Sequence, residues 1–434
     1  MRHSTVELGI VYLHIFIALF YLPLRLIFDS FLWLLLPAFI FTFYFLFFPF
    51  RLRRFKLVPI DYWFILMFLY GVVSSVIGIF ARSTTPMVQY FIHNFLPLST
   101  YFAARFYTRD SIEKNYRLLQ CFYITAWFFV AYIIAEYVWI FVLDIPHTSI
   151  PWMKPHLVLN YDVKLVRSIL LYRHPAGLTL NLIFAVLFPL LLFRYKFKSD
   201  AIKIRPVKGY LLLVLTFISL IFLFIKTSLI SILLLIVLTS GLSKSYIHRF
   251  ITSAIIGIIF ILATTIFWDL IRLVYEDYVI RVNNNTGRSD LAEMAHSFLR
   301  VAEYYQFDDP SIILGSQVIP FDDTTLFRST SYTEARILGY PIAFGMGWFL
   351  MIIFIGIHFI KYISFFLKFE YFRPIGICLA LTLASVLIDF HYGTFIYRGP
   401  QELLLLSLAF FIGYYDSCKS TLKRSLGEHT LIRN

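Results

Sequence analysis

A chain of 434 residues, of which 60% are hydrophobic and 20% aromatic, exposes too much apolar surface to fold as a water-soluble protein. Its mean hydropathy of +0.78 is typical of a chain that crosses a membrane many times. The formal net charge of +13 would suggest a nucleic-acid partner for a soluble protein, but basic loops between membrane spans explain it better. We therefore expect no nucleic-acid partner.

Apolar runs of near-bilayer length predict an all-α polytopic membrane protein with about twelve transmembrane helices, forming a single integral membrane domain over 1–434. The eighth run follows the seventh so closely that the two could instead form one long tilted helix, which would leave eleven spans. The runs lie at about 7–24, 30–50, 60–81, 88–106, 118–143, 170–193, 209–225, 227–243, 250–268, 336–360, 374–390 and 400–415.

The distribution of positive charge favours twelve spans with both termini in the cytoplasm. With that topology, 24 of the 38 lysines and arginines lie on inner segments, and each short outer turn holds one. Eleven spans would move the basic residues of 361–373 and of the tail to the outer side, against the rule that basic loops stay inside. We therefore predict a polar, basic cytoplasmic tail at 416–434.

The longest water-facing segment is predicted between the ninth and tenth spans, at 269–335. A turn-forming cluster at 283–287 precedes Arg288. Asp290 and Glu293 fit a capping box, and apolar residues between 291 and 305 recur on one helical face. We expect a large outer loop that contains an amphipathic surface helix, with Arg288 just before the positive end of that helix.

Cationic side chains gather on the outer side of this topology, at helix ends and in the long loop. A single arginine at a helix end would more simply extend to lipid headgroups. Several together favour a site for a multiply charged anion such as a diphosphate, because they supply both charge and hydrogen-bond donors. The set is Arg167, Arg173, His174, Lys226, Arg288, Arg328, Arg336 and Arg398.

Two residues on the same side are candidate catalytic groups. Glu334 lies close in sequence to Arg328 and Arg336, which would keep it ionised, as a base must be. His391 follows Asp389 by two positions at a helix end, where pairing could leave one group poised near neutral pH. The outer groups that could accept a proton are Glu334, His391, His174 and Asp389. We favour Glu334 as the base, with His391 second and as a candidate positioning residue.

Sequence motifs for metals and nucleotides are missing. There is no HExxH, no cysteine–histidine pairing, no Walker loop and no GxGxxG. We therefore expect no metal site, no cofactor and no nucleotide-driven pump. Glu136 lies about seven residues inside the outer end of the fifth span, and an ionisable residue at that depth is a functional candidate by default.

Several segments, in their order along the chain, resemble signatures of the bacterial O-antigen ligase and polymerase family. RSILLYRHPAG resembles the family's arginine-bearing outer segment, and KTSLISILLL resembles its polar turn between two short helices. TGRSDLAEMA, with ILGSQ further on, resembles its Gly-Arg helix opening and the glycine segment that follows. YTEARILGYPIAFGMGWF resembles the segment that enters the next span.

The chain also departs from the family pattern. The turn arginine is missing, with Lys226 the nearest cation, and Gln317 replaces the second glycine after Gly315. Glu334 stands where ligases usually show a histidine. The last departure favours a polymerase over a ligase.

The resemblance implies a metal-independent, inverting, C-type glycosyltransferase of the bacterial inner (plasma) membrane, with the loop 269–335 in the periplasm. Such an enzyme takes a glycan from an undecaprenyl-diphosphate carrier. A polymerase passes it to the next carrier-linked repeat unit, whereas an O-antigen ligase passes it to lipid A–core. The implied partners are the carrier-linked glycan, membrane lipid and a chain-length regulator protein.

A flippase or other transporter of lipid-linked glycans is the rival from another class. A transporter needs polar groups through the full depth of the membrane. The inner halves of the predicted spans read as nearly uncharged, and the polar set lies on one side. The sequence therefore favours an enzyme over a transporter.

Overall fold

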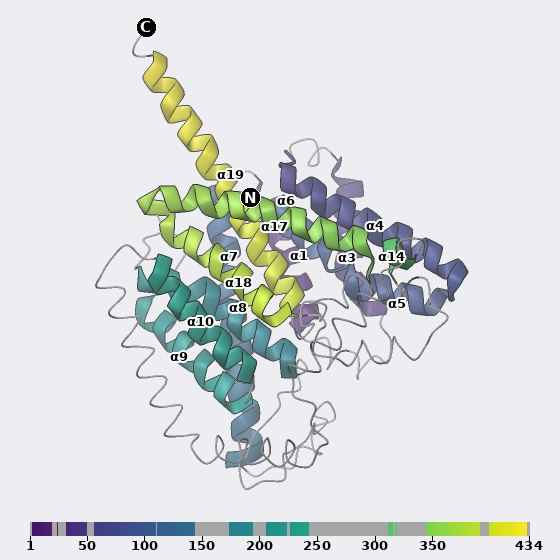
Figure 1. Ribbon diagram of the computed structural model, residues 1–434, viewed down its shortest axis with the longest axis horizontal. Helices are drawn as coiled ribbons and strands as arrows, with labels where there is room; N and C mark the ends of the chain where they lie inside the picture. Colours follow the sequence, from purple (N-terminus) through teal and green to yellow (C-terminus); the bar gives the residue numbers. More distant parts are fainter. Residues whose placement is uncertain are drawn as a thin grey trace.

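The computed structural model describes residues 2–19, 24, 32–49, 56–109, 111–143, 173–193, 205–223, 226–242, 311–315, 318, 344–390 and 399–431. Over these ranges the chain is almost entirely helical and contains no strand (Figure 1). The all-α prediction is confirmed for this part of the chain. The amphipathic helix predicted near 290–305 lies outside it.

The helices pack against one another as a bundle. They are α1 (Arg2–Leu19), η1 (Leu32–Leu35), α3 (Leu36–Phe47), α4 (Pro59–Ala81), α5 (Thr84–Asn94), α6 (Leu98–Thr108), α7 (Ile112–Tyr137), η3 (Val138–Val142), α8 (Arg173–Leu192), α9 (Pro206–Leu223), α10 (Lys226–Leu242), α14 (Ser311–Leu314), α17 (Met346–Lys368), η5 (Glu370–Phe372), α18 (Arg373–Phe390) and α19 (Pro400–Leu431).

Four stretches among the described residues are long and apolar enough to cross a membrane: Pro59–Ala81, Ile112–Tyr137, Met346–Lys368 and Glu370–Leu387. Large apolar side chains on them remain exposed, which suits a surface that faces lipid instead of water. These helices are consistent with a membrane protein. They do not establish twelve spans, and the predicted span 250–268 lies outside the described residues.

The predicted span 88–106 is two helices instead of one. α5 and α6 are separated by Phe95, Leu96 and Pro97, and proline is disfavoured inside a helix because it lacks an N–H. The amides of Phe95 and Leu96 both bond to the carbonyl of Phe91 at 3.0 Å, which closes the turn. Hydropathy alone predicted a continuous span because every residue of this turn is apolar.

The predicted span 336–360 is displaced toward the C-terminus, since α17 covers Met346–Lys368. Gly345 directly before it has a φ of 88°, a conformation that glycine adopts without strain. A β-carbon at Gly345 would overlap the carbonyl oxygen of Ile313. The Ile313 carbonyl, from a distant part of the chain, therefore lies directly against the residue before α17.

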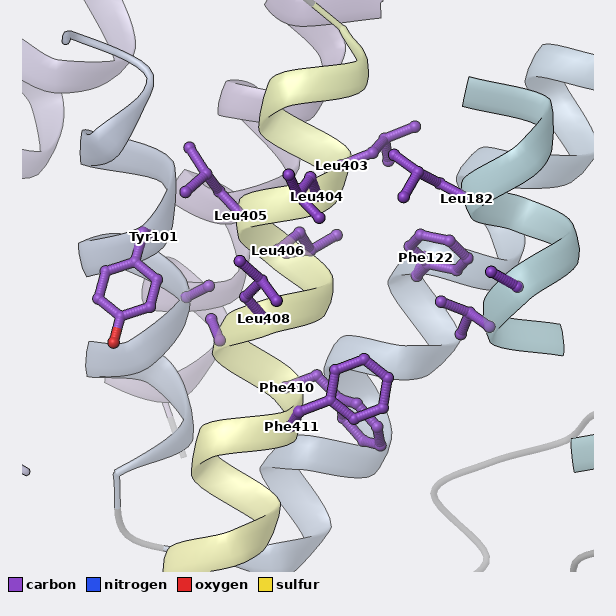
Figure 2. Packing of buried hydrophobic residues seen from close by; sticks show 14 of the residues in the cluster. Tyr101, Phe122, Leu182, Leu403, Leu404, Leu405, Leu406, Leu408, Phe410 and Phe411 are labelled. Carbon is purple, nitrogen blue, oxygen red and sulfur yellow. The ribbon is translucent and has the colours of Figure 1, made fainter. Parts of the chain in front are cut away.

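The last helix, α19, lies at the centre of the packing. It packs against α6, α7 and α8, and all of its residues from 400 to 414 are buried. Figure 2 shows Leu403 facing Leu182 of α8, with Phe122 of α7 on the same flank and Tyr101 of α6 on the other. An apolar surface on all sides is what a fully enclosed helix requires.

α19 also extends beyond its predicted boundary. The span was expected to end near 415, with a separate tail at 416–434, but the helix continues to Leu431. Figure 1 shows its last turns standing clear of the other helices. The tail therefore begins as the continuation of a buried helix, because polar residues end an apolar run without ending a helix.

Candidate functional site

Most of the predicted site residues lie outside the described part of the chain. The structure does place three of them: Arg173 and His174 open α8, and Lys226 opens α10. The residues outside the described ranges are Arg167, Arg288, Arg328, Glu334, Arg336, His391 and Arg398.

The starts of α8 and α10 lie at the same end of a group of packed helices. α8 packs against α9, α10 and α18, and Figure 1 shows α8, α9 and α10 side by side. The Tyr210 hydroxyl, near the start of α9, donates to the carbonyl of Leu191 at the end of α8 (2.9 Å), so the two helices are antiparallel. Only two residues separate α9 from α10. α10 therefore begins at the end of the group where α8 begins.

The C-terminal end of α18 lies at the end of the bundle where α8 and α10 begin. The Cys378 thiol, in the first half of α18, donates to the carbonyl of Val186 in the second half of α8 (3.2 Å). The two helices are therefore antiparallel, and α18 ends at Phe390 where α8 begins. The next residue in the chain is His391. We call this end of the bundle, where α8 and α10 begin and α18 finishes, the cationic end.

Buried polar side chains accompany the apolar residues near the cationic end. Asn181 on α8 and Glu402 in the first turn of α19 are both buried. Glu402 Oε2 accepts from the amide of Gly399 (2.7 Å) and so caps the start of α19. Gln401 Nε2 donates to the carbonyl of Asn94 at the α5–α6 break (3.4 Å). Glu136, which the sequence singled out, is buried near the C-terminal end of α7.

A buried group of charges lies away from the cationic end, where the sequence predicted few. Asp61 accepts two bonds from Arg105, from Nε to Oδ1 and from Nη2 to Oδ2, each 3.0 Å long. The Tyr101 hydroxyl also donates to Oδ1, and the amide of Val58 donates to Oδ2 at 2.9 Å. Arg105 Nη2 lies 3.3 Å from Asp416 Oδ2. We call these residues the ionic cluster.

The ionic cluster joins three helices, and its hydrogen bonds use the acceptor sites of the Asp61 carboxylate. Four donors surround this carboxylate, which offers about four acceptor sites. The side chains of Asp61 and Arg105 are 0% and 2% exposed, whereas Asp416 is 35% exposed. Burial raises the pKa of the Asp416 carboxyl, and the Arg105 guanidinium opposes that rise. The cluster therefore clamps α4, α6 and α19 together.

A second buried pair connects α1 to the same region. Arg109 Nη2 lies 3.2 Å from Glu7 Oε1, and Lys114 Nζ lies 3.7 Å from Oε2. The Tyr44 hydroxyl donates to Oε1 at 3.3 Å, and the Arg109 guanidinium lies 3.5 Å from the centre of the Phe106 ring. The glutamate thus ties α1 to α3, α6 and the start of α7.

These two groups correct the prediction that the inner halves of the spans are nearly uncharged. Glu7, Asp61 and Arg105 are buried charges on helices predicted to cross the membrane, and the buried side chain of Arg109 directly follows α6. Glu7 and Asp61 each lie at the start of an apolar run, which is the only signal in the sequence that could have identified them. Their basic partners follow about 40 to 100 positions later, so no local pattern links them.

The fold identifies only the class of the protein, which is helical and consistent with residence in a membrane. No family model, no curated protein and no solved structure matches it.

Proposed function

We propose that this protein is a membrane glycosyltransferase that polymerises undecaprenyl-diphosphate-linked repeat units on the outer side of a bacterial inner membrane. The observation that most supports the proposal is the cationic end, where Arg173, His174 and Lys226 open two neighbouring helices. Helix starts carry free N–H groups and positive partial charge. Together with cationic residues they favour a diphosphate.

In this proposal the protein has twelve spans, both termini in the cytoplasm and the loop 269–335 in the periplasm. The growing glycan is bound through its anomeric carbon to the carrier diphosphate. A hydroxyl of the next carrier-linked unit attacks that carbon from the opposite face, and the bond to the diphosphate oxygen breaks. The cations stabilise the charge on the departing carrier diphosphate. Arg167, Arg288, Arg328, Arg336 and Arg398 complete the proposed cationic set.

The attacking hydroxyl must lose a proton. Glu334 is the proposed base, because two arginines close to it in sequence favour its ionised form. His391, which follows the end of α18 at the cationic end, is the second candidate. Membrane lipid surrounds the carrier tail, and a chain-length regulator is the expected protein partner.

Two alternative functions, a ligase and a flippase, are weighed against the polymerase. An O-antigen ligase would use the same donor with lipid A–core as acceptor, and Glu334 in place of a histidine favours the polymerase. A flippase gains support from the break between α5 and α6 and from the buried charges of the inner halves, since transporters use both features. The saturated bonds of Asp61 favour a structural role for those charges, so the polymerase remains the proposal.

The deciding experiment uses purified protein in liposomes with a single carrier-linked repeat unit. A polymerase yields a ladder of longer carrier-linked glycans, and a ligase forms product only when lipid A–core is added. A flippase forms no new bond but exposes the substrate on the opposite leaflet. Leaflet exposure without product from well-folded protein would overturn the proposal in favour of the transporter.

The same assay assigns the base. Glu334→Gln should lower the polymerisation rate about a hundredfold to ten-thousandfold, because a general base contributes that much. Arg272→Ala, in the same predicted loop but outside the proposed site, is the matched control and should keep the wild-type rate. If Glu334→Gln is fully active while His391→Ala is inactive, the base is His391. If both variants are fully active, neither residue is the base.

A further inference from the structure

The break between α5 and α6 meets the first turn of α19 through two carboxamide side chains. Asn94, the last residue of α5, donates from Nδ2 to the carbonyl of Tyr90 (2.9 Å). Gln401 Nε2 donates in turn to the carbonyl of Asn94 (3.4 Å). Exchanging nitrogen and oxygen in either carboxamide would set two oxygens against each other, so these bonds fix the orientation of both groups.

The oxygens of these two carboxamides are buried acceptors without a donor. Asn94 Oδ1 and Gln401 Oε1 have no hydrogen-bond partner within the part of the chain that the structure describes. The Gln401 side chain is only 5% exposed, so bulk water does not reach it. Buried carboxamide oxygens normally have a partner, and two such oxygens on contacting side chains therefore indicate a ligand that both can bind.

The surroundings favour a cation as that ligand. Asn94 ends α5, and the last carbonyls of a helix lack intrahelical partners and carry negative partial charge. Glu402, the neighbour of Gln401, is buried, and its Oε2 accepts from the amide of Gly399 (2.7 Å). Neutral oxygens, a helix C-terminus and a nearby carboxylate attract positive charge and disfavour an anion such as a phosphate.

We propose that Asn94 and Gln401 bind a small monovalent cation, such as Na⁺, between the α5–α6 break and α19. Interrupted helices in membrane proteins bind Na⁺ through the carbonyls of their C-terminal ends. A single nearby carboxylate suits a single positive charge, whereas Ca²⁺ and Mg²⁺ sites commonly take carboxylates as direct ligands. Such a site has none of the sequence motifs on which the expectation of no metal site was based. The ion takes no part in the proposed glycan transfer, so this inference is independent of the proposed function.

The test compares purified protein in NaCl, in KCl and in choline chloride at equal ionic strength, because choline is too large to bind between packed side chains. Hydrogen exchange at the amides of Phe95 and Leu96 reports the turn beside the site, since both bond to the carbonyl of Phe91 at 3.0 Å. A ligand that binds only the closed turn slows exchange, and Na⁺ at about ten times its Kd should slow it about tenfold. Peptides of α17 should exchange alike in all three salts.

Slower exchange of the turn in NaCl or KCl than in choline chloride would support the site. Equal exchange in all three salts, up to high salt concentration, would overturn it. Slowing by added MgCl₂ without slowing by either monovalent salt would overturn the monovalent assignment.

Substitutions of Gln401 separate cation binding from packing. Gln401→Leu removes the oxygen but keeps much of the volume, so the salt effect on the turn should disappear. Gln401→Glu places a formal negative charge at the same position, so about tenfold less Na⁺ should give the wild-type slowing. The matched control is Gln120→Leu, a half-buried glutamine on α7, which should keep the wild-type salt response.

A salt effect that survives in Gln401→Leu, or that weakens in Gln401→Glu, would overturn the assignment to these residues. If Gln401→Leu does not fold, Asn94→Leu takes its place, and a wild-type salt response in that variant would overturn the assignment equally. None of these measurements needs a glycan, so failure of the polymerisation assay would leave the cation site to be decided by exchange alone.

Discussion

Replacing Arg105 with methionine removes the guanidinium from the ionic cluster while leaving an apolar side chain in much of the same space. Asp61 would lose two of its four donors, both of them charged, and would keep only Tyr101 and Val58. Removing one partner of a buried ion pair costs about 3–5 kcal/mol, because the remaining charge stays buried without compensation. The lost contact with the partly exposed Asp416 adds at most about 1 kcal/mol.

The matched control is Arg117→Met. Arg117 pairs with Glu113 at 2.7 Å, but the two side chains are 48% and 52% exposed. Exposed pairs of this spacing contribute only about 0.3–0.5 kcal/mol. Heating each variant in detergent and measuring the fraction that remains monodisperse by size-exclusion chromatography gives a melting midpoint. We expect Arg105→Met to lower that midpoint far more than Arg117→Met.

A double variant tests the reason for the loss. Asp61→Leu combined with Arg105→Met removes both charges, so the carboxylate no longer needs a partner, and most of the lost stability should return. The electrostatic reasoning is refuted if the double variant is less stable than Arg105→Met alone. It is equally refuted if Arg105→Met and Arg117→Met melt at the same temperature.

Further predictions concern packing, the anion site and topology. Gly413→Ala should destabilise the protein by about 1–3 kcal/mol, because its β-carbon would overlap a side chain of α7. Gly356 has open space around it, so Gly356→Ala should stabilise the protein by about 0.5–1 kcal/mol. Equal melting midpoints for the Gly413→Ala and Gly356→Ala variants would contradict both expectations. Arg288→Ala should abolish polymer in the liposome assay and Arg288→Lys should restore part of it, since a lysine cannot bind a phosphate through two parallel bonds; full activity of the alanine variant removes Arg288 from the site. A cysteine introduced near Asn284 should react with an impermeant reagent on intact cells while one near Ser199 stays unlabelled, and the reverse pattern would overturn the topology.

Apolar runs identified most described helices because the length and composition of a span are local properties of the sequence. The features that the sequence missed depend on distant partners. The start of α17 is set by Gly345 meeting Ile313 and Tyr70, and the buried charges of Asp61 and Arg105 are 44 positions apart. No periodicity connects such residues, so hydropathy predicted a tenth span that begins earlier than α17 and inner halves that are nearly uncharged.

In the candidate site, too, the sequence predicted the local features and missed those that depend on distant partners. Arg173 and Lys226 were singled out as cations at helix starts, and the structure places both at the starts of α8 and α10. That the two starts lie at one end of the bundle follows from the antiparallel packing of α8 and α9, which the sequence predicted through the order of the spans. Val318 belongs to the outer loop 269–335 that was predicted to face water, but it is fully buried beside Gly78 of α4. This burial was not predictable, because a single apolar residue carries no periodic signal.

The unbroken course of α19 offers a rigid handle for imaging. Its 32 residues extend about 48 Å, with the first half enclosed by other helices and the last turns standing clear (Figure 1). A soluble domain whose own first helix continues from Leu431 in register would inherit the orientation of the enclosed half. Each residue inserted at the junction would turn that domain by about 100° and advance it by about 1.5 Å. Such a fusion would give an otherwise membrane-embedded particle the asymmetric mass that electron-microscopic alignment requires.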